Sequence, residues 1–104
     1  MSVEQNPGTA GRAAVFAALA DPARLAIVDH LLLADASPSE LQAVLGVQSN
    51  LLSHHLGVLR KAGVVDATRS EADGRRTYLR LNHHALDTLV PSAVQLAVIS
   101  LRQV

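Results

Sequence analysis

The sequence predicts a mainly α-helical (α+β) domain with the element order α-α-α-α-β-β-α. Over residues 10–62 the apolar side chains recur at helical spacing. After Gly63 the pattern changes to two short runs that suit β-strands, separated by an Asp-Gly pair that favours a tight turn. Helical spacing returns after Asn82. A chain of 104 residues holds one small domain, which we assign to residues 10–104.

The first two predicted helices differ in their composition. Residues 1–9 have no periodicity and are predicted to form a flexible N-terminal arm. Residues 10–20 are rich in alanine and have a high helix propensity. A second helix should begin at Asp21-Pro22, because aspartate is a good N-cap and proline suits the first helical position. This helix, at about 22–34, is apolar nearly all round and is expected to be central.

The stretch 38–62 is predicted to form two short helices joined at a glycine. Ser37 and Glu40 have the spacing of a capping box, and Pro38 suits the first helical position, so the first helix should begin there. Gly46 should end it, because glycine adopts the left-handed cap conformation without a steric penalty. Two short helices with such a turn are typical of a helix-turn-helix.

The second helix of this pair has an apolar face and a polar face. The apolar stripe must face a core and consists of Leu52, Leu56 and Leu59. The opposite face is polar and short near its start and basic near its end, as suits a helix that enters the DNA major groove. The hairpin predicted over 64–81 carries further arginines, which is typical of the wing of a winged helix. The residues predicted to contact DNA are Gln48, Ser49, Asn50, Leu51, Ser53, His54, Arg60, Lys61, Arg69, Arg75 and Arg76.

Two kinds of DNA contact are expected within this set. Asn50 can pair bidentately with adenine, and Leu51 can contact a thymine methyl group. Arg60, Lys61 and the wing arginines would hold phosphates, which sets register rather than sequence. Although the formal net charge of the chain is zero, residues 48–80 contain six Arg and Lys against three Asp and Glu, a net charge of +3. This segregation favours double-stranded DNA as the partner.

A last helix is predicted over 83–103, with a kink or a restart at Pro91. Residues 93–101 expose apolar groups on almost every side, which is more than a small domain can bury by itself. We therefore expect a homodimer whose seam is formed by this helix and the helix at 10–20. The residues predicted at the dimer interface are Val15, Phe16, Leu19, Val94, Leu96, Val98, Ile99 and Leu101.

Composition excludes several classes of site. The chain contains no cysteine, which excludes disulfides, thiolate metal sites and thiol redox sensing. No apolar run approaches the length of a membrane span, so no membrane partner is expected. The first residues lack the layout of a signal peptide, and we therefore expect a cytoplasmic location.

Two alternatives to DNA binding follow from the same residues. An enzyme would have to use Ser53 with His54 or His55. Adjacent residues on a helix point about 100° apart, so Ser53 and His54 do not face each other, and this alternative is disfavoured.

The other alternative is a protein-interaction module, which would pair with a different protein through residues 93–101 and bind no DNA. The charge segregation argues against it, and a mobility-shift test would separate the two.

Four segments stand in a characteristic order: Ala18-Leu19-Ala20-Asp21-Pro22-Ala23-Arg24-Leu25, Glu40-Leu41 through Leu45-Gly46-Val47, Ser53-His54-His55-Leu56 with Ala62-Gly63-Val64-Val65, and Gly74-Arg75-Arg76 with Tyr78. Together they resemble the ArsR/SmtB (arsenic-repressor) family of bacterial transcription regulators, over about residues 13–86. The resemblance implies a dimeric winged helix of the bacterial cytoplasm that binds an inverted-repeat operator and usually represses.

The sequence departs from this family where an effector is usually sensed. The stretch 40–44, where many relatives carry a cysteine pair, contains no thiol. From Thr88 to Val104 there is no His, Asp, Glu or Cys, so the usual four-ligand zinc site cannot form. A metal-responsive regulator remains an alternative, with nickel or zinc held in a weaker site across a dimer by the remaining candidate ligands His83, His84 and Asp87. The effector is otherwise unknown.

A smaller departure concerns the start of the second helix of the pair. Gln48 stands where relatives often carry a capping serine. Ser49 is therefore expected to take the capping role one position later.

Overall fold

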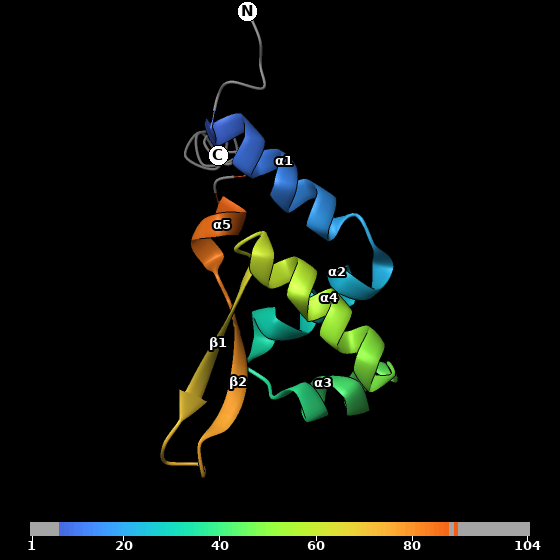
Figure 1. Ribbon diagram of the computed structural model, residues 1–104, viewed down its shortest axis with the longest axis vertical. Helices are drawn as coiled ribbons and strands as arrows, with labels where there is room; N and C mark the ends of the chain where they lie inside the picture. Colours follow the sequence, from blue (N-terminus) through green and yellow to red (C-terminus); the bar gives the residue numbers. More distant parts are fainter. Residues whose placement is uncertain (1–6, 88, 90–104) are drawn as a thin grey trace, which may run out of the picture.

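The computed structural model describes residues 7–87 and 89 and has the predicted winged helix-turn-helix fold (Figure 1). Four helices are followed by an antiparallel hairpin and a short helix, which confirms the predicted order. The elements are α1 (Pro7–Leu19), α2 (Pro22–Leu33), α3 (Pro38–Leu45), α4 (Ser49–Lys61), β1 (Val65–Ser70), β2 (Arg76–Leu81) and α5 (His83–Asp87).

Local caps determine where the central helices begin and end. The Oδ2 atom of Asp21 accepts a hydrogen bond from the Arg24 backbone N–H at 3.1 Å, and α2 begins at the next residue. The Oγ atom of Ser37 accepts one from the Glu40 backbone N–H at 3.2 Å. Gly46 ends α3 in the left-handed conformation, with φ of 66°. These three predicted features are confirmed, and they fix the helix-turn-helix turn.

Two predicted boundaries are wrong. Helix α1 begins at Pro7, so residues 7–9 are helical and do not belong to an arm; residues 1–6 lie outside the described part of the chain. Proline at a first helical position explains the early start, because its fixed φ suits the helix and no N–H partner is needed there. Ser49 is the first residue of α4, whereas Gln48 takes the N-cap position without a side-chain cap hydrogen bond.

Buried aliphatic side chains from α1, α2, α3, α4 and both strands form one core cluster. The leucine stripe of α4 is buried in this cluster, as predicted. Helix α2 buries only one side, through Ile27, Val28 and Leu31. Helix α2 is central as expected, since it packs against α1, α3, α4 and β2, but its apolar surroundings are incomplete: Leu25, Leu32 and Leu33 are exposed, Leu33 to 85%. Burial therefore follows the neighbours of α2 and not its composition.

The hairpin forms from the two predicted runs. Its antiparallel register places Thr68 opposite Tyr78. The predicted Asp-Gly turn lies in the loop at 71–75, where Gly74 and Arg75 both adopt positive φ, 67° and 61°. A non-glycine residue rarely adopts positive φ, so the backbone of Arg75 has an uncommon left-handed conformation at the wing tip.

The base of the hairpin is attached to the loop between α2 and α3. Leu79 and Ala36 exchange two backbone hydrogen bonds, of 2.7 Å from the Leu79 N–H and 3.2 Å from the Ala36 N–H. Beside them, Nε of Arg80 lies 3.2 Å from Oδ2 of Asp35. The wing is thus joined to the helix-turn-helix through main-chain bonds and one surface ion pair.

Only the start of the last predicted helix is described. Helix α5 spans His83–Asp87, and the side chains of Leu86 and Leu89 pack against the core. The predicted extension to residue 103, the kink at Pro91 and five predicted interface residues lie outside the described part of the chain: Val94, Leu96, Val98, Ile99 and Leu101. No helix in the described part has both the length and the hydrophobicity that a lipid bilayer requires of a span.

Candidate nucleic-acid interface

Helix α4 separates a buried stripe from an exposed polar face. The stripe of Leu52, Leu56 and Leu59 is inside, with Leu59 fully buried. All the residues predicted to contact DNA are exposed: Gln48, Ser49, Asn50, Leu51, Ser53, His54, Arg60, Lys61, Arg69, Arg75 and Arg76. Figure 1 shows the start of α4 beside α3 at the lower end of the molecule, toward which the tip of the hairpin also points. The arrangement leaves one helix face and one hairpin accessible to a large partner.

Asn50 has a local partner in this structure. Its Oδ1 atom accepts a hydrogen bond from the Leu51 backbone N–H at 2.9 Å. Bidentate pairing with adenine needs both the oxygen and the nitrogen of the amide, so Asn50 would have to give up this bond. Ser53 lies one turn further along the exposed face, and its hydroxyl is not committed in this way among the hydrogen bonds of the described chain.

The basic residues of α4 lie at the end away from Asn50, about 16 Å further along the axis at 1.5 Å per residue. Arg60 and Lys61 line an open groove of about 500 Å³ between α4 and β1. Arg60 also lines a second hollow of about 300 Å³, together with Arg69 of β1. Arg60 thus borders one hollow with Lys61 and another with Arg69, beside β1 and apart from the polar start of α4.

The wing tip is shaped by a side-chain bond. The Tyr78 hydroxyl donates to Oδ2 of Asp73 across the loop. This bond to a carboxylate raises the pKa of Tyr78 above its ordinary value. Arg75 and Arg76 follow directly, both exposed, so the tip presents two guanidinium groups next to a fixed turn. Arg80, on the same strand, is instead paired with Asp35.

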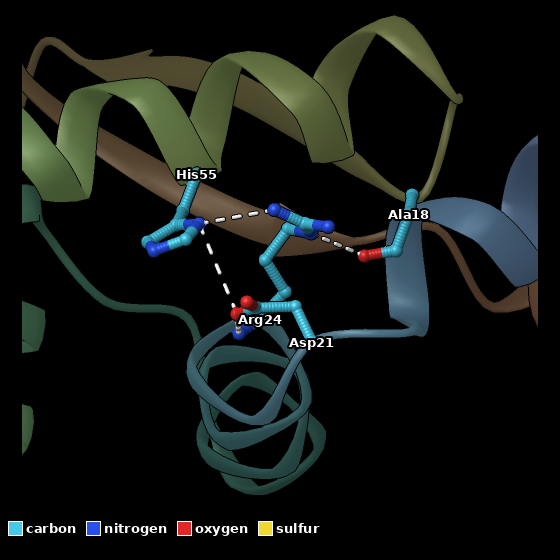
Figure 2. A network of polar contacts seen from close by, with 4 residues as sticks. All are labelled: Ala18, Asp21, Arg24 and His55. Atoms are coloured by element: carbon cyan, nitrogen blue, oxygen red, sulfur yellow. Dashed lines mark hydrogen bonds and ion pairs between the residues drawn. The ribbon is translucent and has the colours of Figure 1, made fainter.

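The sequence reasoning missed one polar cluster on the inner side of α4, shown in Figure 2. His55 is buried, with Nδ1 lying 3.2 Å from Nη1 of Arg24 and 4.0 Å from Oδ2 of Asp21. Arg24 donates from Nε to the Ala18 carbonyl at 2.5 Å. The pKa of Asp21 is lowered, chiefly because its carboxylate accepts the Arg24 backbone N–H. The sequence does contain a signal for the burial of His55, because this residue stands three positions after Leu52 and so lies on the same face of the helix as the apolar stripe.

The candidate metal ligands His83, His84 and Asp87 all lie on the short helix α5. Within residues 7–87 and 89 of a single chain, no three His, Cys, Asp or Glu side chains are grouped closely enough to hold an ion, and a site shared across a dimer stays a prediction.

The predicted dimer-interface residues of α1 divide into two groups. Val15 is buried within the core of its own chain, and Leu19 is partly buried against it, so neither is a free surface residue. Phe16 is 49% exposed. Of the three α1 residues predicted at the dimer interface, Phe16 is therefore the one whose side chain is accessible to a partner.

The exposed face of α4 and the hairpin together indicate the class of protein. An exposed polar helix face after a tight turn, followed by a basic hairpin, is the arrangement of a winged helix-turn-helix nucleic-acid-binding domain.

Comparison with known proteins narrows the class to a family. Residues 19–67 match a family model described as a helix-turn-helix domain. An ArsR-like transcriptional regulator from Rhodococcus sp. RHA1 has a TM-score of 0.73 and 30% identity, covering 90% of this chain and 86% of that one. The crystal structure of Rv0081 from Mycobacterium tuberculosis has a TM-score of 0.66 and 35% identity, covering 96% of this chain and 100% of the other. The chain belongs to the ArsR family of helix-turn-helix transcriptional regulators.

Two further relatives carry more specific names. The biofilm growth-associated repressor of Agrobacterium fabrum is 50% identical over 54 residues, which are 52% of this chain and 45% of that protein. A homodimeric winged helix-turn-helix domain from Mycobacterium bovis has a TM-score of 0.68 and 25% identity, covering 93% of this chain and 90% of the other. The matches to curated relatives span about half of those proteins, between 45% and 60% of their length.

Proposed function

We propose that this chain is a homodimeric transcriptional repressor that recognises an inverted-repeat operator through α4 and its wing. The observation that carries the proposal is the division of α4, which buries Leu52, Leu56 and Leu59 and exposes a mostly polar face beside a basic hairpin. The names of two relatives support repression: the biofilm growth-associated repressor of Agrobacterium fabrum, and the transcriptional repressor SmtB of Mycobacterium tuberculosis, which is 43% identical over 77 residues.

In this proposal the two ends of α4 do different work. Ser49, Asn50, Leu51, Ser53 and His54, near the start, read base edges in the major groove. Arg60, Lys61 and the arginines of the hairpin hold phosphates and so set the register of the complex. In a two-fold dimer the half-sites would lie about 34–36 Å apart, one helical turn of DNA.

The direct test is selection of duplexes from a random library by the purified chain, followed by anisotropy titration of the enriched duplex and a scrambled one at low and at high salt. We expect enrichment of an inverted repeat, tighter binding of the enriched duplex, and affinity that falls steeply with salt. A chain that enriches no sequence and binds no duplex at low salt would be a protein-interaction module instead.

The dimer is tested on α1. Phe16→Glu should convert a dimeric chain into monomers, because it places a charge on an exposed apolar side chain of the proposed seam without touching the core. Leu33→Glu, at an even more exposed apolar residue of α2, is the matched control and should leave the dimer intact. Light scattering at a fixed protein concentration measures both. A native chain that is monomeric, or equal loss in the two variants, would contradict this seam.

The wing is tested by charge removal. Arg76→Ala should weaken binding to the enriched and scrambled duplexes alike and lower the slope of log affinity against log salt by about one unit. Arg80→Ala removes the same side chain from the same strand, but from a residue already paired with Asp35, so the slope should hold. If both variants lower the slope equally, the hairpin acts through its total charge and Arg76 makes no phosphate contact.

A further inference from the structure

His55 connects the proposed reading helix to the junction of α1 and α2. Its ring is 7% exposed and faces inward, whereas the preceding residues Ser53 and His54 are exposed. In Figure 2 the ring of His55 and the guanidinium of Arg24 point toward each other, and Arg24 reaches on to the Ala18 carbonyl at the end of α1. One side chain of α4 is thereby tied to two other helices.

Because Arg24 can only donate hydrogen bonds, its contact with His55 is possible in only one protonation and tautomeric form of the imidazole. A guanidinium group has only N–H donors and keeps its charge at every physiological pH. The contact of 3.2 Å between Nη1 and Nδ1 is therefore a hydrogen bond only when Nδ1 carries a lone pair. That condition requires a neutral imidazole with its proton on Nε2.

The hydrogen bond between Arg24 and His55 gives α4 a directional constraint that the leucine stripe does not provide. Apolar packing is non-directional, so the leucines fix which side of α4 is buried but hold its rotation loosely. A hydrogen bond is directional, and a satisfied buried polar network selects one arrangement. Successive helical residues are about 100° apart, so holding His55 also fixes where Ser53 and Asn50 point.

We propose that His55 is a positioning residue for DNA reading: its neutral ring, held by Arg24, sets the rotation of α4 about its own axis. This inference rests on the proposed function. A protonated ring has no lone pair on Nδ1 and could not accept this bond.

The surroundings of His55 determine what replaces that bond. The charged or titratable groups that face it in the described chain are Arg24 of α2, Asp21 at the N-cap of α2 and, on its own helix, His54, with ring centroids 5.6 Å apart; α1 contributes the Ala18 carbonyl. A protonated ring would place a second cation 3.2 Å from Arg24 and leave Asp21, 4.0 Å away, as the alternative partner. The pKa of Asp21 is lowered, so its carboxylate is ionised. The contact with Arg24 that orients α4 therefore requires the neutral ring.

The experiment compares the native chain with two variants of His55. His55→Asn keeps an acceptor, because its Oδ1 can accept from Arg24. His55→Leu has a similar volume and no acceptor. Each chain is titrated at about pH 8 with the duplex enriched by the native chain and with a scrambled duplex.

At this pH, the native and His55→Asn chains should prefer the enriched duplex equally, and His55→Leu should lose about tenfold of that preference while still binding the scrambled duplex. Full preference in the His55→Leu chain, or the same loss in the His55→Asn chain, overturns the proposal.

Nitrogen-15 NMR of the native chain gives a second readout that does not depend on whether His55→Leu folds. We expect Nδ1 of His55 to be unprotonated at about pH 8 and Nε2 to carry the proton. A proton on Nδ1 overturns the proposal. A native chain that enriches no duplex overturns the proposed function itself, whereas a preference that survives in His55→Leu overturns only the positioning role.

Discussion

Replacing Leu59 with alanine should lower the free energy of unfolding by about 2–5 kcal/mol. Leu59 is fully buried where α4 meets the core, so the substitution removes packed atoms and leaves a cavity that the neighbouring side chains fill only in part. A small domain has only about 5–15 kcal/mol of stability in total, so the loss is a large fraction of it. Urea denaturation followed by circular dichroism measures the effect.

Two variants act as controls for Leu59→Ala. Leu51→Ala removes the same atoms from the same helix, but Leu51 is 49% exposed, so stability should change by no more than about 0.5 kcal/mol. Leu59→Met conserves volume and should cost less than about 1.5 kcal/mol. Equal destabilisation by Leu59→Ala and Leu51→Ala would mean that the leucine stripe does not define the buried side of α4.

Ser53→Ala should cost about 1–3 kcal/mol in binding to the enriched duplex and almost nothing in binding to a scrambled duplex. The side chain is exposed on the polar face of α4, so its loss removes a hydrogen-bonding group without disturbing the core. Anisotropy titration of both duplexes at one salt concentration separates base reading from phosphate binding, because only base reading differs between sequences.

Asn50→Ala provides the comparison for Ser53→Ala. The Asn50 carbonyl oxygen is already bonded to the Leu51 N–H, and breaking that bond offsets part of what adenine pairing would gain. We therefore expect a smaller specific loss than for Ser53→Ala. If Ser53→Ala weakens both duplexes equally, this face of α4 holds phosphates and the bases are read elsewhere.

Features encoded within one turn of the chain could be predicted from the sequence. The Ser37 cap, the glycine at 46 and the leucine stripe each depend on residues no more than about two turns apart, and the structure contains all three. Contacts between distant residues could not be predicted in this way. His55 and Arg24 are separated by 31 positions, and the spacing of apolar residues does not indicate that the turn after α1 brings them together. The same holds for Ala36 and Leu79.

The candidate site shows the same limit. The exposed face of α4 follows from its spacing, but the sequence could not show that Asn50 bonds its own helix or that Arg80 is engaged by Asp35. It also placed Val15 at a surface, because alanine-rich helices give little indication of which side is buried.

The two ends of the hairpin differ in how much change they can tolerate. At the base, the paired hydrogen bonds between Ala36 and Leu79 fix the register, and a shift of one residue would turn every strand side chain to the opposite face. The loop at 71–75 is exposed throughout and contributes nothing to the buried core. Its length and charge can therefore change without disturbing the fold, so substitutions at the tip would tune the strength of DNA binding while the scaffold stays the same.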